Sequence, residues 1–137
     1  MGGVDKRRIL IADDNAGDLS VLAKVLEQAD YEVITACDGR DAFRLALENR
    51  PDLIILDVFM PRMPGGLVRL SLKEAAETSE IPVIFLSCLF SEQEIAGQDI
   101  MFGDSPRLGK PCDRDKLLKA VEKALGAAAG LPDRGKS

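Results

Sequence analysis

The feature that most constrains this chain is an alternation, repeated five times, of short apolar runs with longer stretches of helical periodicity. The short runs, which predict β-strands, lie at Arg8–Ala12, Glu32–Ala36, Leu53–Asp57, Pro82–Ser87 and Arg107–Lys110. The third and fourth runs are apolar almost throughout, a pattern typical of parallel strands buried on both faces. The longer stretches predict helices at Ala16–Ala29, Asp41–Asn49, Gly65–Glu77, Ser91–Met101 and Asp113–Ala128.

Strands that alternate with helices need crossover connections, and these connect parallel strands. We therefore expect an α/β fold, with a doubly wound five-stranded parallel sheet between two layers of helices. Within the helix at 65–77, Leu67, Leu70 and Ala75 are expected to face the core. In such three-layer sandwiches a ligand site lies beyond the carboxyl ends of the strands, where the strand order reverses.

Composition excludes several classes of function. The 137 residues fit one domain, and the net charge of −5 with 4% aromatic residues does not supply the basic, base-stacking surface of a nucleic-acid binder. The chain has no histidine, which excludes Ser-His-Asp and Cys-His catalysis and any imidazole metal site.

The three cysteines, Cys37, Cys88 and Cys112, are widely spaced and indicate reduced thiols that fill space. Cys112 is expected at the start of a helix, where the helix dipole would lower the pKa of its thiol. There is no apolar stretch of signal-peptide or membrane-span type, so we expect a soluble protein in the cytoplasm, without membrane contact.

Polar residues that carry chemistry follow four of the predicted strands. Asp13 and Asp14 follow the first strand, Asp57 ends the third, Ser87 ends the fourth and Lys110 ends the fifth. The aspartates also have ordinary structural roles, because an Asp-Asp pair often caps a helix and an Asp often begins a turn. Three carboxylates at one sheet edge repel one another unless a cation joins them, and oxygen ligands favour Mg²⁺.

Together these residues and their surroundings resemble the receiver domain of two-component response regulators, the family that includes the bacterial chemotaxis regulator. The resemblance covers about residues 7 to 125 and rests on Ile11–Asn15, Asp57–Gly65, Ser87 and Leu108–Pro111. It implies a flavodoxin-like (βα)5 fold, with a receiver domain at residues 1–125. Residues 126–137 are then expected to form a flexible tail or linker, and the chain is either a single-domain regulator or part of a longer one.

The resemblance assigns a role to each residue at the sheet edge. Asp57 is expected to accept a phosphoryl group and to bind Mg²⁺ together with Asp13, Asp14 and the backbone carbonyl of Phe59. Of these, Asp14 is expected to bind the ion directly, whereas Asp13 holds it through water.

Two further residues are expected to act on the phosphoryl group. Lys110 pairs with the acceptor carboxylate before transfer and with a phosphoryl oxygen afterwards, and Ser87 is the switch hydroxyl. The Lys110–Pro111 peptide bond is expected to be cis, as in the family. Arg107 stands where the family commonly has Tyr or Phe, and we expect it to face solvent, paired with an acid such as Asp104.

The resemblance implies a signalling switch rather than a turnover enzyme. Its partners would be a sensor histidine kinase or phosphotransfer protein and a downstream effector or output domain. One alternative is a Mg²⁺-dependent phosphatase or phosphotransferase of the haloacid dehalogenase type, but that family has a second acid where this chain has Phe59. The other is a pseudo-receiver that only binds partners. A P-loop NTPase is excluded because the chain has no GxxxxGK[ST] motif.

Overall fold

The structure is a computed structural model that describes residues 6–87, 103, 105–110 and 112–129. Its strands are β1 (Arg8–Ala12), β2 (Glu32–Ala36), β3 (Leu53–Leu56), β4 (Val83–Ser87) and β5 (Arg107–Gly109). All pair in parallel, in the order β2-β1-β3-β4-β5. The chain thus starts at an inner strand of the sheet and builds outward in both directions, which confirms the doubly wound fold. The order reverses between β1 and β3.

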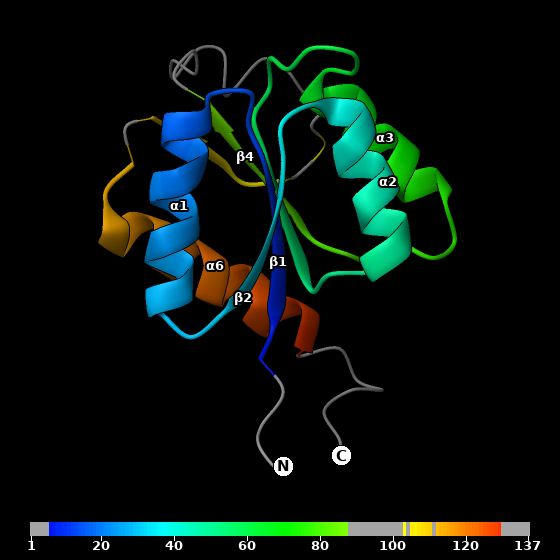
Figure 1. The fold of residues 1–137 in the computed structure, drawn as a ribbon. Helices are drawn as coiled ribbons and strands as arrows, with labels where there is room; N and C mark the ends of the chain where they lie inside the picture. The colour runs from blue at the N-terminus through cyan, green and yellow to red at the C-terminus, as the bar shows by residue number, and fades with distance from the viewer. Residues whose placement is uncertain (1–5, 88–102, 104, 111, 130–137) are drawn as a thin grey trace.

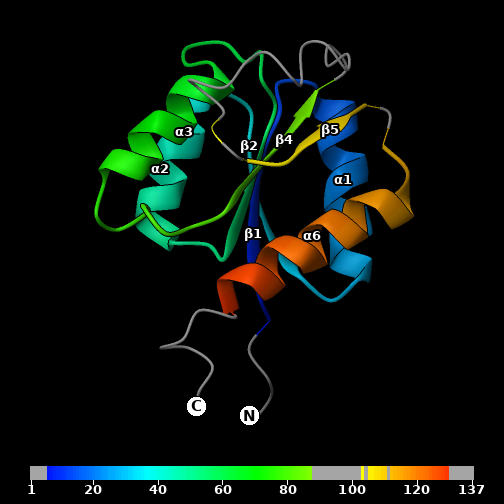
Figure 2. The ribbon, with the colours of Figure 1, turned by 180° about the vertical axis from the view of Figure 1, so that it is seen from behind.

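The described helices are α1 (Ala16–Gln28), α2 (Gly39–Asn49), α3 (Gly65–Glu74) and α6 (Arg114–Ala129). Helices α1 and α6 cover one face of the sheet, and α2 and α3 cover the other (Figures 1 and 2). None of these helices has both the length and the apolar character of a membrane span. The expected helix at Ser91–Met101 lies outside the described residues.

The sheet separates two hydrophobic cores. Ile9 and Ile55 face the α1 and α6 side, whereas Leu10 and Ile54 face the α2 and α3 side. Successive residues of a strand point to opposite faces, so a strand covered on both sides must be apolar at every position. This explains the continuous apolar runs in the sequence, and in β1, β3 and β4 it leaves polar side chains only at the strand ends.

Helix α3 differs from its expected form. It ends at Glu74, because Ala75 is extended, with φ −88° and ψ 129°. Its buried apolar residues are Val68 and Leu72, whereas Leu67 is 44% exposed. The expected stripe was therefore wrong at Leu67, because its neighbour Val68 faces the core instead.

Helix α6 continues to Ala129 and so runs past residue 125, where the sequence analysis placed the end of the domain. Apart from Leu125 itself, its buried residues are Leu117 and Val121, which belong to the α1-side core.

Candidate functional site

The acidic residues come together at the point where the strand order reverses. Ala12 ends β1 and Leu56 ends β3, and these two residues are paired in the sheet. The N–H of Asp57 donates to the carbonyl of Ala12 at 2.9 Å, which continues the pairing one residue further. Asp13 and Asp57 therefore emerge side by side at the carboxyl edge, as the sequence predicted.

Asp13, Asp14 and Asp57 form one cluster, with a carboxylate oxygen from each lying within 4.8 Å of the others. Asp13 and Asp57 are buried, whereas Asp14 is exposed. Asp13 is held in place because its Oδ1 accepts the N–H of Asn15 at 2.9 Å. All the ligand atoms of this cluster are carboxylate oxygens, and this donor set suits a hard divalent cation.

The alternative that the Asp-Asp pair caps the following helix is wrong. Asn15 is the N-cap of α1, and its side-chain oxygen accepts the N–H of Asp18 at 2.9 Å. Neither Asp13 nor Asp14 is needed for that cap, which leaves both carboxylates available to the cluster.

Lys110 brings a positive charge into the cluster. It follows β5, and its N–H donates to the carbonyl of Ser87 at 3.1 Å, so it leaves the sheet at the same edge. The Lys110 Nζ lies 2.6 Å from Asp13 Oδ2 and 3.6 Å from Asp57 Oδ2. Its side chain is only 13% exposed, so these ion pairs are largely shielded from solvent.

The environment of Asp57 acts on its ionisation in opposite directions. Burial and the neighbouring Asp13 carboxylate raise its pKa, whereas Lys110 and the backbone N–H groups of Val58 and Phe59 lower it; the net effect is a raised pKa. For Lys110, burial disfavours the charged form, but hydrogen bonds to Asp13 and Asp18 outweigh it and raise the lysine pKa above its usual value. The ammonium is therefore firmly charged.

Ser87 and Phe59 complete the expected set. Ser87 is buried at the end of β4, beside β3 in the sheet, and pairs with Gly109 of β5. Phe59 is 60% exposed, and with Asp14 it borders a pocket of about 350 Å³ that is also lined by Met60, Pro61 and Pro64. Its side chain is therefore directed away from the core, beside the acidic cluster.

Asp18 was missed by the sequence analysis. Its Oδ2 lies 3.1 Å from Lys110 Nζ, on the first turn of α1. The available signal was an acid in the first turn of the helix that begins directly after the Asp-Asp pair. That signal alone does not reveal which way the carboxylate points, because an acid at this place is also favoured by the helix dipole.

A glycine lets α3 begin close to Asp57 at the end of β3. A Cβ at Gly65 would collide with the backbone carbonyl oxygen of Asp57, and the Gly65 N–H donates to Val58 at 2.9 Å. The turn that follows Asp57 is thus held tightly against the end of β3, which restrains the backbone at the Asp57 carboxylate.

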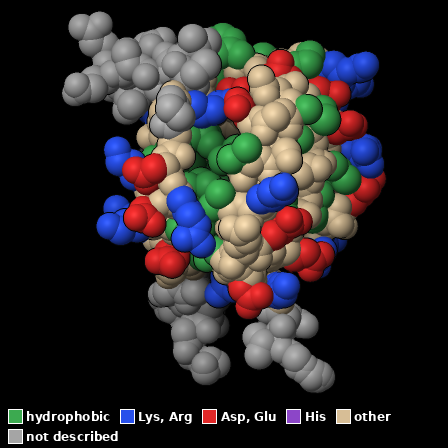
Figure 3. Space-filling model, turned by 60° about the vertical axis from the view of Figure 1, so that its left-hand side comes forward, with side chains coloured by type: hydrophobic (Ala, Val, Ile, Leu, Met, Phe, Trp, Pro, Cys, Tyr) green, Lys and Arg blue, Asp and Glu red, His purple; other side chains and the backbone are tan. Residues whose placement is uncertain are grey.

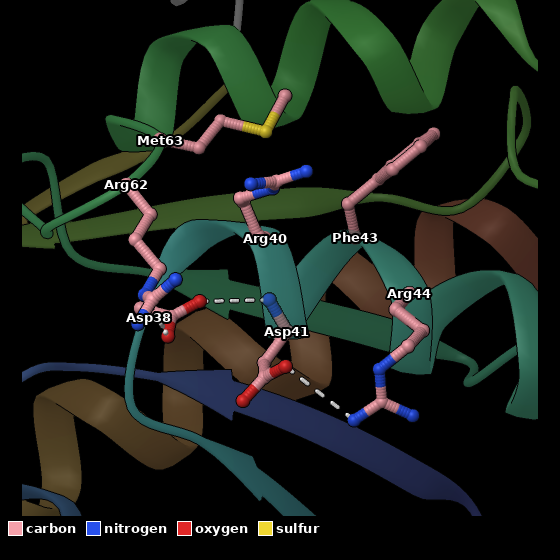
Figure 4. A pocket seen from close by; sticks show the side chains of 7 residues that line it. All are labelled: Asp38, Arg40, Asp41, Phe43, Arg44, Arg62 and Met63. Atoms are coloured by element: carbon pink, nitrogen blue, oxygen red, sulfur yellow. Dashed lines mark hydrogen bonds and ion pairs between the residues drawn. The ribbon is translucent and has the colours of Figure 1, made fainter.

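A larger pocket, of about 590 Å³, has no residue of the acidic cluster in its lining; Figure 4 shows the side chains that line it. Its lining residues come from α2 with the residue before it and from the loop before α3: Asp38, Arg40, Asp41, Phe43, Arg44, Arg62 and Met63. Its aspartates already have partners, since Asp38 caps α2 and pairs with Arg62 at 3.4 Å, and Asp41 pairs with Arg44 at 3.4 Å. None of the residues expected to carry chemistry lines this pocket.

Two expectations about cysteines are corrected. Cys37 is exposed, so it does not fill space in the core. The pKa of the Cys112 thiol is raised instead of lowered, because of its burial and the neighbouring Asp113 carboxylate, and α6 starts only at Arg114. Cys88 lies outside the described residues.

Arg107 is half-buried rather than turned fully to solvent, and its Nη2 donates to the carbonyl of Gly103 at 3.1 Å. A backbone carbonyl satisfies a guanidinium N–H without a second charge, which is why the side chain can pack partly inside. Its expected partner Asp104, and Pro111 of the expected cis bond, lie outside the described residues.

Comparison with known proteins gives one consistent family. The model of the response regulator receiver domain matches residues 9–122. Protein PilH of Pseudomonas aeruginosa is 34% identical over 119 residues, which is 86% of this chain and 97% of PilH. The transcriptional regulatory protein PrrA of Mycobacterium tuberculosis is 37% identical over 124 residues, which is 90% of this chain but 52% of PrrA.

Solved structures agree with the sequence matches. Chemotaxis protein CheY4 of Vibrio cholerae superimposes with a TM-score of 0.80 at 29% identity, over 88% of this chain and 99% of that chain. Among the sequence relatives, the response regulator PleD of Caulobacter vibrioides is 38% identical over 118 residues, but the chain spans only 26% of the length of PleD. A match over nearly the whole described sheet, with the acidic cluster at its carboxyl edge, identifies the family: the chain belongs to the receiver domains of two-component response regulators.

Proposed function

We propose that Asp57 is the phosphoacceptor of this receiver domain. A carboxylate oxygen of Asp57 attacks the phosphorus of the donor, and the bond from phosphorus to the donor's leaving atom breaks as the acyl phosphate forms. With a phosphohistidine donor the leaving atom is an imidazole nitrogen, which keeps its electron pair. The observation that carries the proposal is the buried Asp57 carboxylate at the end of central strand β3, 3.6 Å from the Lys110 ammonium and clustered with two further acids.

Asp13, Asp14 and Asp57 are the residues that would hold a divalent cation, and Mg²⁺ is our proposal for the ion. Their fit rests on the donor set, which is three carboxylates within 4.8 Å of one another. We further propose that the Phe59 carbonyl is a ligand, and that Asp13 acts through a water molecule. When bound, the ion supplies positive charge that offsets the crowding of carboxylates and of phosphoryl oxygens.

Lys110 and Ser87 are proposed to act on the phosphoryl group. The Lys110 ammonium, held beside Asp57, neutralises one phosphoryl oxygen by a charge-assisted hydrogen bond. The Ser87 hydroxyl, at the end of the neighbouring strand β4, donates to another. We expect the Ser87 hydroxyl to move toward the phosphoryl group, and we expect partners to recognise the change in conformation that follows.

Receiver domains generally act as switches, and we propose the same for this chain rather than turnover of a substrate. A phosphatase is not favoured, because the chain matches the receiver family over residues 9–122 and has Phe59 where a dehalogenase-type phosphatase has its second acid. A pseudo-receiver is not favoured, because Asp13, Asp14, Asp57 and Lys110 are all present. A generic phosphate ester should therefore not be turned over in the presence of Mg²⁺.

Receiver domains interact with histidine kinases or phosphotransfer proteins and with output domains, and we propose such partners here. We also propose that the chain itself binds no nucleic acid. On the face shown in Figure 3, acidic and basic side chains are interspersed and no basic stripe forms, in keeping with the net charge of −5. A receiver domain at residues 1–125, a tail at 126–137 and a location in the cytoplasm stay predictions.

Phosphorylation is tested with a small acyl phosphate, Mg²⁺ and the intact mass of the protein. The parent is expected to gain the mass of one phosphoryl group, and Asp57→Asn is expected to gain none, because an amide is not a nucleophile here. Asp41→Asn, which removes an exposed carboxylate outside the cluster, should label like the parent. Equal labelling of the Asp57 variant would refute the proposal.

A further inference from the structure

Lys110 has a carboxylate partner that lies outside the motifs on which the receiver resemblance rests. Its Nζ lies 2.6 Å from Asp13, 3.1 Å from Asp18 and 3.6 Å from Asp57. A lysine ammonium has three N–H bonds, and three carboxylates surround it here. The two shorter distances are those to Asp13 and Asp18, so the ammonium is held nearer to these two acids than to the acceptor.

The place of Asp18 in α1 is rigid. Asp18 is the third residue after the N-cap Asn15, whose side chain accepts the Asp18 N–H at 2.9 Å. The side chain of Asp18 is 48% exposed, so burial does not force it against Lys110. Its contact with the ammonium therefore reflects the direction in which the first turn of α1 presents this carboxylate.

An acid at this helix position does not need such a contact. Asp41 is the third residue after the N-cap Asp38 of α2, and its N–H donates to Asp38 Oδ1 at 2.8 Å. Its side chain is 51% exposed, and its carboxylate pairs with Arg44 on its own helix. The two aspartates thus share capping geometry and exposure, and they differ in the cation that they hold.

We propose that Asp18 is a positioning residue for Lys110, which holds the ammonium beside Asp13 and so limits its reach toward Asp57. This inference rests on the proposed function, in which Lys110 neutralises charge as Asp57 becomes phosphorylated. Without the Asp18 carboxylate, Lys110 approaches Asp57 and the incoming phosphoryl group more closely. Loss of an ion pair that is half exposed, as this one is, is expected to accelerate labelling by roughly twofold to fivefold.

The first test compares initial labelling rates with a small acyl phosphate and Mg²⁺. Asp18→Asn is expected to label faster than the parent, and Asp41→Asn at the parental rate. In a Lys110→Met background, which keeps an apolar side chain of similar length without charge, Asp18→Asn should change nothing further. The same acceleration with Lys110 and in the Lys110→Met background would indicate a general effect of charge and would overturn the positioning role. No acceleration in the protein that retains Lys110 would overturn it as well.

The second test needs neither metal nor phosphorylation. In the metal-free protein, the side-chain ammonium of Lys110 is followed by ¹⁵N NMR and assigned by its loss in Lys110→Met. Its chemical shift is expected to be the same in the parent and in Asp41→Asn, and to change in Asp18→Asn, because the ammonium loses one carboxylate partner and moves toward Asp57. An unchanged signal in Asp18→Asn sinks the inference. If the parent shows this signal but is not labelled at Asp57, the proposed function is refuted instead.

Discussion

Two carboxylates and one ammonium share a nearly closed space at the carboxyl edge of this sheet. Asp13 and Asp57 are buried, and Lys110 lies between them and Asp18. Burial is the largest cause of the raised pKa of Asp57 and the Asp13 carboxylate adds to it, whereas the Lys110 ammonium offsets these effects only in part. The folded protein therefore holds Asp57 in a state that favours its protonated form more than the unfolded chain does.

This imbalance predicts that Asp57→Asn stabilises the metal-free protein at neutral pH. An acid whose pKa is raised on folding contributes its full stability below its unfolded pKa, about 3.9, and loses that contribution as the pH rises through the folded pKa. Asparagine resembles the protonated acid at every pH. Urea unfolding with a chelator should give a higher midpoint for the variant at pH 7, and the difference should shrink toward pH 4; a lower midpoint at pH 7 contradicts the account.

The convergence of Asp13, Asp14, Asp57 and Lys110 was predictable, because each follows a strand and parallel strands share their carboxyl edge. Asp18 was not, since its contact depends on the rotation of α1, which the sequence leaves open. The burial of Arg107 was missed for a related reason, because its partner is the carbonyl of Gly103, a backbone group that no side-chain pattern reveals.

Among the elements, the segment between β3 and α3 determines how Asp57 is held. Gly39 N–H donates to the carbonyl of Pro61 at 3.3 Å, and Arg62 pairs with Asp38 at 3.4 Å, so this segment is docked on the start of α2. Arg62 has φ 72°, and the Met63 N–H donates to Pro61 at 2.8 Å, which is a tight three-residue turn. Gly65 then places α3 directly against Asp57.

The close approach at Gly65 predicts that Gly65→Ala destabilises the fold. The added methyl group would collide with the carbonyl of Asp57, a backbone atom that cannot move without shifting β3, and overpacking of this kind costs about 1–3 kcal/mol. Gly126→Ala is the matched control, because its Cβ would meet nothing within 4 Å and alanine favours a helix. Urea unfolding should place the two variants on opposite sides of the parent, and a neutral Gly65→Ala would contradict this packing.

The elements themselves followed from the alternation of apolar runs, since each of the five expected strands is present. Their ends and the inward face of α3 were less accessible to sequence. Leu67 and Val68 are neighbours of equal apolar character, and only the packing of α3 at Gly65 decides that Val68 is buried and Leu67 exposed. Periodicity therefore predicts that a helix is amphipathic more reliably than it predicts the helix's rotation.

At the scale of the whole molecule, the two cores leave the carboxyl edge as the place where buried charge is tolerated. The sheet is apolar on both faces, and the buried carboxylates Asp13 and Asp57 stand just beyond its strands. Their mutual repulsion is a cost to the entire cooperative fold. Any ligand that neutralises the cluster only in the folded state should stabilise the molecule as a whole.

We accordingly predict that Mg²⁺ raises the thermal stability of the protein. At a concentration one hundred times the dissociation constant, binding to the folded state alone contributes about 2.7 kcal/mol. The unfolding temperature should rise with Mg²⁺ and return to its metal-free value when a chelator is added. Asp13→Asn should weaken the response and Asp41→Asn should not; equal responses in all three proteins would place the ion elsewhere.

The central claim, that Asp57 accepts the phosphoryl group, is tested most directly by mapping the modified residue. Borohydride reduces an acyl phosphate to an alcohol and releases phosphate, so a phosphorylated aspartate becomes homoserine. After labelling with a small acyl phosphate and Mg²⁺, reduction and proteolysis, peptide mass spectrometry is expected to find homoserine at position 57 alone. Homoserine at Asp13, Asp14 or Asp18, or at no position of a protein that carries the label, would contradict the account.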